Sequence, residues 1–418
     1  MVMKTCNRAR VVRPAAGRYA GTVLVALLAP IWSPQSVPAA DLPNSSAQVE
    51  SPALVGMSAE RLSRITPRMQ QFVDDRQIAG AVTLVARQGR IVHLEAAGWA
   101  DIEQNRPMTI DALFAVASMT KPITATAVLM LQDEGRLSVA DPVSKYIAAF
   151  KDVRLDGAAP VREITIRDLL THTSGIGQPP PAASGSDRSL AEFAEQVAKA
   201  PLRFQPGSKW EYGNGLTVCG RIIELVSGQD YAAFLRERIF APLKMQDTTF
   251  HPGPELRNRL ATMYQRGPDG KSIVAVARPL ADRPRTPNPS GGLFSTAADM
   301  CRFYQMILDG GACAGQTIVS KAAVEQMTHL QTGPLATGFT PGNGWGLGWC
   351  LVQQPQGVSG MLSPGTFGHG GAWGTQGWVD PQRQLILVLM IQRQNFGNSD
   401  GSDVRQAFQQ LAVDAITP

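Results

Sequence analysis

The sequence predicts an α+β fold in which one antiparallel sheet, flanked by helices, is formed from the two ends of the chain. Two observations carry this prediction. Segments with the apolar composition of strands occur within residues 81–97 and again after residue 345, whereas the segments between them are rich in helix-forming residues. Strands from both ends are expected to pair with each other, with the helical middle inserted as a lobe.

The first two strands are predicted at residues 81–87 and 90–97, on either side of Gln88-Gly89. A two-residue connection that ends in glycine is typical of a tight hairpin turn. Further strands are expected near the other end of the chain, with Asp380-Pro381-Gln382 as the turn of the last hairpin. They are residues 345–352, 374–380 and 384–392.

Residues 118–134 are predicted to form a long apolar helix that ends at Gly135. Because this helix is apolar on most of its faces, it is expected to be buried in the middle of the protein. The Pro- and Arg-rich residues 252–290 are expected to form loops. The other predicted helices are residues 166–171, 189–199, 215–227, 230–240, 296–309, 320–330 and 402–415.

The first 40 residues have the pattern of a secretory signal peptide. Five cations and no acid accompany a short apolar stretch from Tyr19 to Trp32, and Val37-Pro-Ala-Ala40 supplies small residues for cleavage. The stretch is too short and too interrupted by prolines to favour a membrane span, and no cysteine follows it to carry a lipid anchor. The sequence therefore predicts a periplasmic or secreted protein.

Removal of this leader changes the charge of the protein. The full chain has 39 Lys+Arg and 34 Asp+Glu, and without the five leader cations both totals are 34. A protein near neutrality has no global electrostatic reason to bind nucleic acid.

Residues 41–418 are predicted to form a single domain of two interleaved lobes. These are an α/β lobe of about residues 55–115 and 290–418 and a helical lobe of about residues 116–289.

Four cysteines remain after the leader. Export permits disulfides, and Cys301 with Cys313 is the one candidate pair, because the two are close in sequence. Four unpaired thiols are the alternative, and the other two are Cys219 and Cys350. The five histidines are scattered with no spacing typical of a metal site, so no metal or other cofactor is expected.

Ser118 and Lys121 are the first candidate catalytic residues. They lie three residues apart at the start of the predicted apolar helix, and positions i and i+3 share a helix face. An amine with a lowered pKa can take the proton of a serine hydroxyl, and N–H groups at a helix N-terminus can hold an oxyanion. The same spacing also arises by chance, but no other lysine of the chain has a serine three residues before it.

Tyr212 and Asn214, in the segment Trp210-Glu-Tyr-Gly-Asn, are the next candidates. A tyrosine beside a lysine ammonium ionises more easily and can act as a general base or proton shuttle. Asn214 is then placed to orient Lys121 or the substrate carbonyl. The alternative is that Tyr212 is an ordinary half-buried aromatic.

The segment Gly368-His369-Gly370-Gly371-Ala372-Trp373 precedes a predicted strand. Adjacent glycines let a substrate lie against the backbone, and an N–H group there can complete an oxyanion hole with that of Ser118. The alternative is a β-bulge or turn with an incidental histidine.

In their order and spacing these three motifs resemble the class C β-lactamase-like serine hydrolases. That family includes penicillin-binding DD-peptidases, β-lactamases, family VIII carboxylesterases and D-aminopeptidases. The resemblance runs from about residue 58 to 412 and implies a β-lactamase/transpeptidase-like fold for the whole domain. Its supporting segments are residues 169–176, 206–212, 291–300 and 368–371.

The resemblance also implies a role for each candidate residue. Ser118 is expected to be the acylated nucleophile, with Lys121 and Tyr212 as base and proton shuttle and Asn214 as a polar orienting group. The oxyanion hole is expected at the backbone N–H groups of Ser118 and Ala372. His172, within Thr-His-Thr-Ser-Gly, is expected to be structural and is assigned no catalytic role.

One departure from the family concerns substrate choice. His369-Gly370-Gly371 stands where β-lactamases and DD-peptidases usually carry Lys-Thr-Gly, which helps to hold a substrate carboxylate. Histidine is largely neutral at pH 7 and Gly370 has no side chain, so an efficient β-lactamase is not favoured. Four tryptophans of the same region are expected either in the core or lining an apolar acyl pocket that would suit an esterase. They are Trp345, Trp349, Trp373 and Trp378.

The sequence therefore predicts a secreted serine hydrolase that acts on carboxylic esters or small amides through an acyl-serine intermediate. The alternatives are a β-lactamase, DD-carboxypeptidase or D-aminopeptidase acting on β-lactams or cell-wall peptides, and a catalytically inactive binding protein on the same fold. The intact Ser118, Lys121 and Tyr212 argue against the last. An α/β-hydrolase is not favoured, because the Gly-x-Ser-x-Gly match at residues 397–401 is followed by no histidine that could complete a Ser-Asp-His triad.

Overall fold

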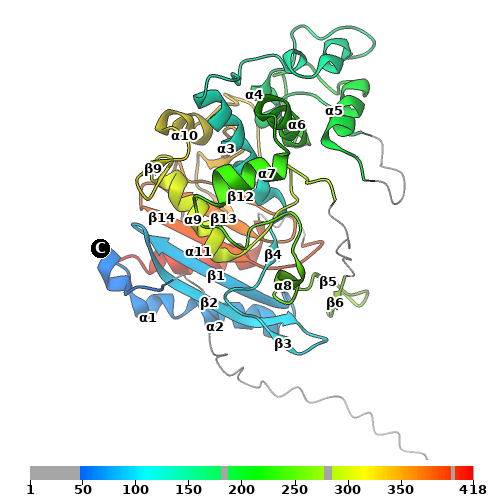
Figure 1. Ribbon diagram of the computed structural model, residues 1–418. Coiled ribbons are helices and arrows are strands. Elements are labelled where there is room, and N and C mark those ends of the chain that lie inside the picture. The colour runs from blue at the N-terminus through cyan, green and yellow to red at the C-terminus, as the bar shows by residue number, and fades with distance from the viewer. Residues whose placement is uncertain (1–47, 180–186, 277–284, 397–400, 418) are drawn as a thin grey trace, which may run out of the picture. The chain divides into compact units, whose positions relative to one another are not determined.

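The computed structural model describes residues 48–179, 187–276, 285–396 and 401–417. The predicted signal peptide, residues 1–40, lies outside these residues. Among the described residues, eight strands form one antiparallel sheet in the order β10-β11-β12-β13-β14-β1-β2-β3 (Figure 1). The strands are β1 (Gly80–Arg87), β2 (Arg90–Asp101), β3 (Arg106–Pro107), β10 (Asn343–Trp345), β11 (Cys350–Val352), β12 (Phe367–Gly370), β13 (Gln376–Asp380) and β14 (Leu385–Met390).

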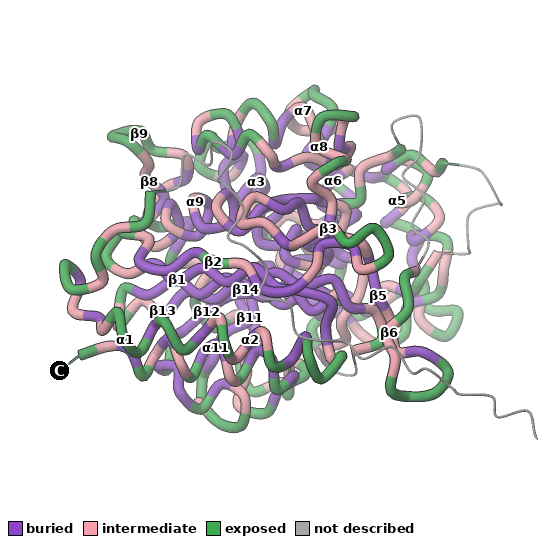
Figure 2. Tube along the Cα trace, turned by 90° about the horizontal axis from the view of Figure 1, so that it is seen from below, coloured by how far each residue is buried: buried purple, intermediate pink, exposed green. Residues whose placement is uncertain are grey.

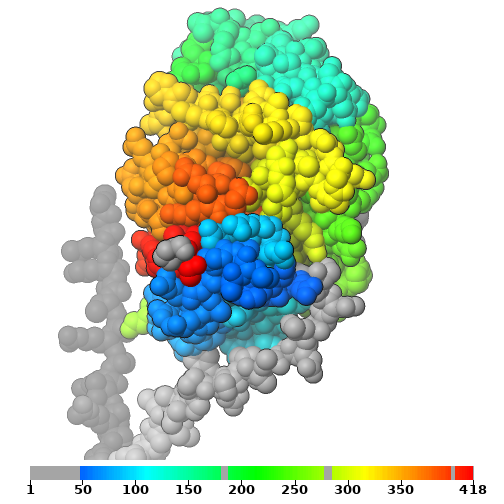
Figure 3. Space-filling model, turned by 90° about the vertical axis from the view of Figure 1, so that its left-hand side faces the viewer, coloured from blue at the N-terminus to red at the C-terminus, as the bar shows by residue number. Residues whose placement is uncertain are grey.

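The two ends of the chain meet in this sheet. β1 pairs with β2 on one side and with β14 on the other, in a register that places Val82 opposite Met390 and Arg87 opposite Leu385. A further bridge joins Met57 to Ile416, and Figure 3 shows the N-terminal and C-terminal segments side by side. The predicted α+β fold, with a sheet built from both ends, is confirmed.

Helices cover both faces of the sheet, as the alternation of side chains along β1 requires. Val82 and Leu84 belong to the apolar cluster that contains α3 and α9, whereas Ala81 and Val85 belong to the cluster that contains α2 and α11. The central strands are therefore buried on both sides (Figure 2). The helices are α1 (Ala59–Leu62), α2 (Ile65–Asp74), α3 (Thr120–Asp133), α4 (Ile166–Leu170), α5 (Leu190–Lys199), α6 (Gly215–Ser227), α7 (Tyr231–Leu235), α8 (Pro254–Arg257), α9 (Ala297–Leu308), α10 (Lys321–Thr328) and α11 (Asp403–Asp414).

The helix predicted at residues 118–134 is α3, and it is buried along almost its whole length. Its apolar composition on most faces is explained by its neighbours, because it packs against α6 and α10 and against β12. None of the helices among the described residues is long and apolar enough to span a bilayer.

Several sequence predictions of local structure are wrong. Residues 345–352 form two strands rather than one, because a turn separates β10 from β11. In that turn Gly348 has a φ of +78°, and the N–H of Gly346 bonds to the carbonyl of Trp349. The segment at residues 368–373 precedes β13, as predicted, but its first three residues also lie within β12.

Residues 252–290 are also more structured than predicted, since they contain α8 and a small hairpin of β5 (Tyr264–Arg266) and β6 (Ile273–Ala275). Cys301 and Cys313 are both free thiols, as is Cys219, so the candidate Cys301–Cys313 disulfide is not formed. Two more small strand pairs are β4 (Phe114–Ala115) with β7 (Phe294–Ser295) and β8 (Ala312–Cys313) with β9 (Gln316–Thr317).

Candidate active site

Ser118 lies where the chain passes from β4 into α3, within a single 3₁₀ turn, η2 (Ala117–Met119). Ala117, immediately before it, has a φ of +47°, in the left-handed region that residues other than glycine rarely adopt. The strained turn is held by a hydrogen bond of 2.7 Å from the Thr120 hydroxyl to the Ala117 carbonyl. Backbone strain of this kind concentrates at functional sites, and here it fixes the direction of Ser118.

Lys121 lies one turn further along, with its amine directed back at Ser118, as the i, i+3 spacing predicts. Its Nζ donates to Ser118 Oγ at 3.0 Å and to the carbonyl oxygen of Ser290 at 2.7 Å. The residue is only 3% exposed, and no carboxylate lies within ion-pair distance of it in the described part of the chain. Burial alone therefore lowers the pKa of Lys121 from 10.5 to about 7. An amine in that range is substantially neutral at pH 7 and has a lone pair for the serine proton.

Tyr212 faces the same amine from the segment before α6. The Lys121 Nζ lies 4.6 Å from the centroid of the Tyr212 ring, a distance typical of a cation–π contact when the amine is protonated. The structure thus brings together the three residues for which the sequence predicts proton transfer.

Asn214 is the N-cap residue of α6, but its side-chain amide donates to Gln178. The hydrogen bond to Lys121 that the sequence allowed for Asn214 is not formed in the described structure. The residue lies two positions beyond Tyr212, beside the site rather than within its hydrogen-bond network.

His369 lies in β12, opposite Gly377 of β13, with its ring turned towards Tyr212. The ring centroids of His369 and Tyr212 are 6.1 Å apart, and Trp345 packs edge-on against the imidazole at 5.5 Å. Burial, together with the nearby Lys121, lowers the pKa of His369 to about 3. The imidazole is therefore neutral where the sequence resemblance would place a lysine cation.

The glycines after His369 bring the backbone of β12 against the segment that carries Ser118. A Cβ atom on Gly371 would lie 2.5 Å from the Val116 carbonyl oxygen, so only glycine fits there. Thr375 also donates to that carbonyl at 3.2 Å. Gly370 pairs with Gln376 in the sheet.

Ala372 follows at an exposed turn, and its N–H makes no hydrogen bond within the described part of the chain. An N–H group without an intramolecular partner in this part of the chain is what an oxyanion donor requires.

Three of the four tryptophans are core residues, as one of the two sequence interpretations expected. Trp345, Trp349 and Trp378 are fully buried, and Trp373 packs half-buried against the small cluster around Phe294. Trp345 also contacts His172 and His369, so its buried indole packs against both histidines next to Tyr212.

Two residues of the site have no signal in the sequence. Ser290 contributes only its backbone carbonyl to Lys121, and any residue has a carbonyl. Phe339 lies in the loop before β10 and is 49% exposed, with its ring 5.1 Å from that of Tyr212 and 6.0 Å from that of Trp210. No helix or strand periodicity marks this residue, so only the tertiary structure reveals that it borders the site.

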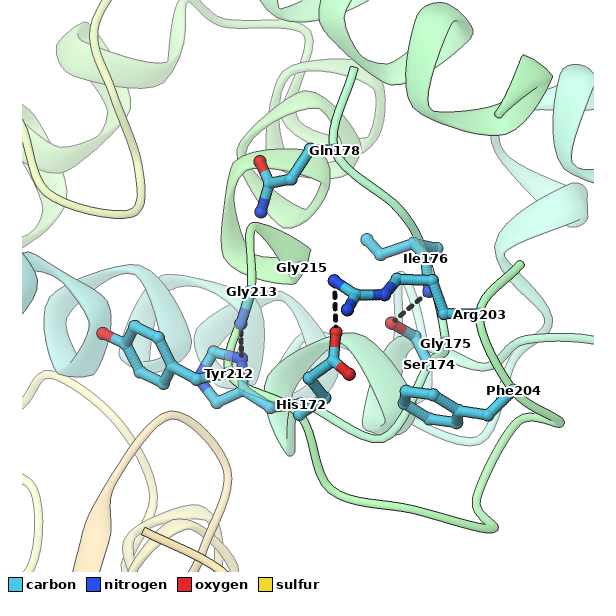
Figure 4. A pocket seen from close by; sticks show the side chains of 11 residues that line it. His172, Ser174, Gly175, Ile176, Gln178, Arg203, Phe204, Tyr212, Gly213 and Gly215 are labelled. Carbon is cyan, nitrogen blue, oxygen red and sulfur yellow. Dashed lines mark hydrogen bonds and ion pairs between the residues drawn. The ribbon is translucent and has the colours of Figure 1, made fainter. Parts of the chain in front are cut away.

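A small cavity of about 10 Å³ lies beside His172 and Tyr212 (Figure 4). That volume is close to what one water molecule needs. Its lining includes His172, Ser174 and Gly213, together with an ion pair of 2.6 Å between Arg203 and Glu211. No group of three or more His, Cys, Asp or Glu side chains with metal-binding geometry occurs among the described residues.

Comparison with known proteins relates both the sequence and the fold to one family. The model of the Beta-lactamase family matches residues 65–412. Esterase EstB of Burkholderia gladioli is 32% identical over 367 residues, which cover 80% of this chain and 91% of that protein. Penicillin-binding protein 4 of Amycolatopsis lactamdurans is 32% identical over 315 residues, which cover 74% of this chain and 78% of that protein.

The fold is similar to that of a solved hydrolase with promiscuous acyltransferase activity, EstCE1. The TM-score is 0.73 at 25% identity, over 86% of this chain and 98% of that one. Relatives with esterase and penicillin-binding names thus share both sequence and architecture with this chain.

Proposed function

The chain belongs to the β-lactamase family of serine hydrolases, and from this premise we propose that it hydrolyses carboxylic esters or small amides through an acyl-serine intermediate. One observation carries the proposal. A buried amine, with a pKa lowered to about 7, lies 3.0 Å from the Ser118 hydroxyl and has no carboxylate partner among the described residues. Such a group is suited to accept a proton at neutral pH.

In the proposed reaction the Oγ–H proton of Ser118 passes to the neutral Lys121 amine, or to Tyr212, as Oγ bonds to the acyl carbon. The oxyanion that forms accepts hydrogen bonds from the N–H groups of Ser118 and Ala372. The proton then passes to the leaving oxygen or nitrogen as its bond to the acyl carbon breaks. In the second half of the reaction a water molecule attacks the acyl carbon and gives a proton to the same base. The base returns this proton to Ser118 Oγ as the bond between Oγ and the acyl carbon breaks, and the acid is released.

The surroundings of His369 support a neutral ester rather than a carboxylate-bearing β-lactam as the preferred substrate. Its buried neutral imidazole offers no cation to a substrate carboxylate, and Gly370 offers no hydroxyl. The half-exposed Phe339 beside Tyr212 provides an apolar surface at the edge of the site instead. The esterase name of one relative agrees with this preference, and the penicillin-binding name of another keeps β-lactams and cell-wall peptides as the alternative.

Intact-mass measurement of the acyl adduct tests the proposal. The protein is incubated with short-chain p-nitrophenyl esters, β-lactams and D-amino-acid peptides, and peptide mapping locates the adduct. We expect rapid turnover of neutral esters with the adduct on Ser118. An adduct with β-lactams or D-amino-acid peptides alone would establish the alternative function.

Two proposals about the whole chain accompany this one. We propose that residues 1–40 direct the protein to the periplasm or the exterior, and that residues 41–418 form a single β-lactamase-like domain. N-terminal sequencing of the exported protein tests the first, and limited proteolysis of the mature protein tests the second.

A further inference from the structure

His172 contacts three consecutive residues of the segment that carries Tyr212 (Figure 4). Its carbonyl oxygen accepts the N–H of Glu211 at 2.9 Å, and its Nδ1 accepts the N–H of Gly213 at 3.3 Å. Its imidazole packs against the Tyr212 ring with centroids 4.5 Å apart. The backbone of His172 thus holds this segment before Tyr212, and its side chain holds it at Tyr212 and after it.

The imidazole that makes these contacts has a fixed conformation and tautomer. His172 has a φ of +61°, in the left-handed region. Because the Gly213 N–H donates to Nδ1, that nitrogen carries a lone pair and the proton of the neutral ring is on Nε2. Burial, the Lys121 charge and the nearby His369 all lower the pKa of His172 well below 6.5, so the ring keeps this tautomer at neutral pH.

Tyr212 depends on these contacts because no regular structure places it. Residues 210–213 belong to neither a helix nor a strand, and α6 begins only at Gly215. The Lys121 Nζ lies 4.6 Å from the centroid of the Tyr212 ring. A displacement of this segment would therefore open the space between Tyr212 and Lys121 to water.

We propose that His172 is a positioning residue, which holds Tyr212 beside Lys121 and so sets the geometry of proton transfer without exchanging a proton itself. The inference rests on the proposed function, in which Ser118 reacts and Lys121 and Tyr212 transfer its proton. It assigns a role to a histidine that the sequence motif alone presents as structural.

Two substitutions separate the hydrogen bond of His172 from its ring. His172→Asn places a carbonyl oxygen where Nδ1 lies and suits the left-handed backbone, since asparagine tolerates that conformation. His172→Phe keeps a ring against Tyr212 but offers no acceptor to Gly213. We expect His172→Phe to lower kcat at least 30-fold with KM within threefold, and His172→Asn to lower kcat at most tenfold.

The pH profile supplies a readout that a general loss of stability would not move. The titratable groups around Lys121 are Tyr212, His172 and His369, and both histidines are neutral at pH 7. When water reaches Lys121, its pKa rises towards 10.5. The pH at which kcat/KM rises should therefore be higher by at least half a unit in His172→Phe than in the wild type. His172→Asn should keep the limb of the wild type.

A matched control is His93, which is buried to the same degree within β2 and bonds to Thr83 at 2.8 Å. His93→Phe and His93→Asn should lower the melting temperature without moving the pH limb. A His172→Phe rate within threefold of the wild type, equal losses in both His172 variants, or losses that follow the unfolded fraction would each overturn the proposal.

The rates are measured twice, by ester turnover and by fluorophosphonate modification of Ser118. A wild-type protein that reacts with the fluorophosphonate but hydrolyses no ester would overturn the ester proposal alone. The role of His172 would then be decided by the modification rates of its two variants.

Discussion

Two buried ionisable groups, Asp168 and Lys121, have opposite surroundings. The Asp168 carboxylate accepts two hydrogen bonds from Arg162, at 2.6 and 2.9 Å, and two from Thr165, both at 2.8 Å. Lys121 is equally buried but donates only to Ser118 Oγ and to one carbonyl, with no counter-charge in the part of the chain that the structure describes.

The difference separates a network suited to holding the fold from one suited to proton transfer. A buried charge that is fully paired stabilises its surroundings when both partners are present, whereas a buried amine without a counter-charge is destabilised in its charged form. Residues other than glycine with a positive φ also lie close to Lys121, at Ala117 and His172. Perturbed titration and backbone strain at one place are typical of functional sites.

The largest effect should follow from the removal of Ser118. Ser118→Ala is expected to lower ester turnover by about 10⁴-fold or more, because loss of a nucleophile removes the covalent route. The free energy of unfolding should change by less than about 1 kcal/mol, since the hydroxyl is not part of the core. Fluorophosphonate labelling followed by peptide mass spectrometry measures the first effect. Labelling of another serine, or unchanged turnover, would contradict the assignment.

The second test asks whether Lys121 and Tyr212 act as one proton-transfer unit. Lys121→Met and Tyr212→Phe should each lower kcat by about 10³-fold, and the double variant should lose no more than either single one. Independent, multiplicative losses would show that the two groups are not coupled.

Lys121→Met also sharpens the comparison with Asp168. It replaces an unpaired buried amine by an apolar side chain of similar length, so it should raise the free energy of unfolding by about 1 to 3 kcal/mol at pH 7. Urea unfolding measures this change. A destabilised Lys121→Met would mean that the bonds of the amine to Ser118 and Ser290 outweigh its burial.

The opposite result is expected for Asp168. Asp168→Ala leaves Arg162 and the N-terminus of α4 without their acceptor, so the free energy of unfolding should fall by about 3 kcal/mol. Turnover by the folded fraction should remain within about fivefold of the wild type. Asp152→Ala serves as the control, because that carboxylate is on the surface and should change stability by less than about 0.5 kcal/mol. If Asp168→Ala lowered turnover by more than its loss of stability explains, Asp168 would have to be assigned to the candidate active site.

The sequence predicted the parts of this site that depend on local spacing. Ser118 and Lys121 share a face because a helix repeats every 3.6 residues, and the structure brings Tyr212 to the same amine. The contacts of His172 were not predictable, because they join residues about 40 positions apart through a backbone N–H. Local pattern does not encode such pairs.

The same limit explains the errors in the strands. Residues 345–352 are apolar throughout, so their composition indicates one strand, whereas Gly346 and Gly348 make the turn between two. The segment around His369 precedes β13 as predicted, but its first residues also lie within β12, which their composition does not indicate because glycines weaken strand propensity. Its pairing with both β11 and β13 overrides that propensity.

The lowered pKa of Lys121 predicts the pH dependence. The neutral amine is the active form, so kcat/KM should rise through a pKa near 7 and fall about tenfold for each pH unit below it. The same shift affects stability. Between about pH 7 and 10.5 the unfolded chain binds a proton that the folded protein does not, so this group should make the free energy of unfolding increase with pH over that range.

Lys121→Met should lack this increase, which separates the contribution of Lys121 from those of other groups. Stopped-flow kinetics and urea titrations at a series of pH values measure both quantities. A kinetic limb near pH 10 would show that the amine is not desolvated in the free enzyme.

The smallest effect concerns substrate preference at His369. His369→Lys combined with Gly370→Thr restores a cation and a hydroxyl at the end of β12, and a charge-assisted hydrogen bond to a substrate carboxylate contributes about 1 to 2 kcal/mol. The ratio of kcat/KM for a carboxylate-bearing β-lactam to that for a neutral ester should therefore rise about 5- to 30-fold. His329→Lys adds the same charge at an exposed position and should leave the ratio unchanged.

His369→Ala should keep appreciable activity on a small neutral ester, because a buried neutral imidazole there sets preference and does not take the serine proton. If His369→Ala instead lost activity as completely as Ser118→Ala, His369 would be the base, and the unpaired amine of Lys121 would no longer distinguish this region from that of Asp168.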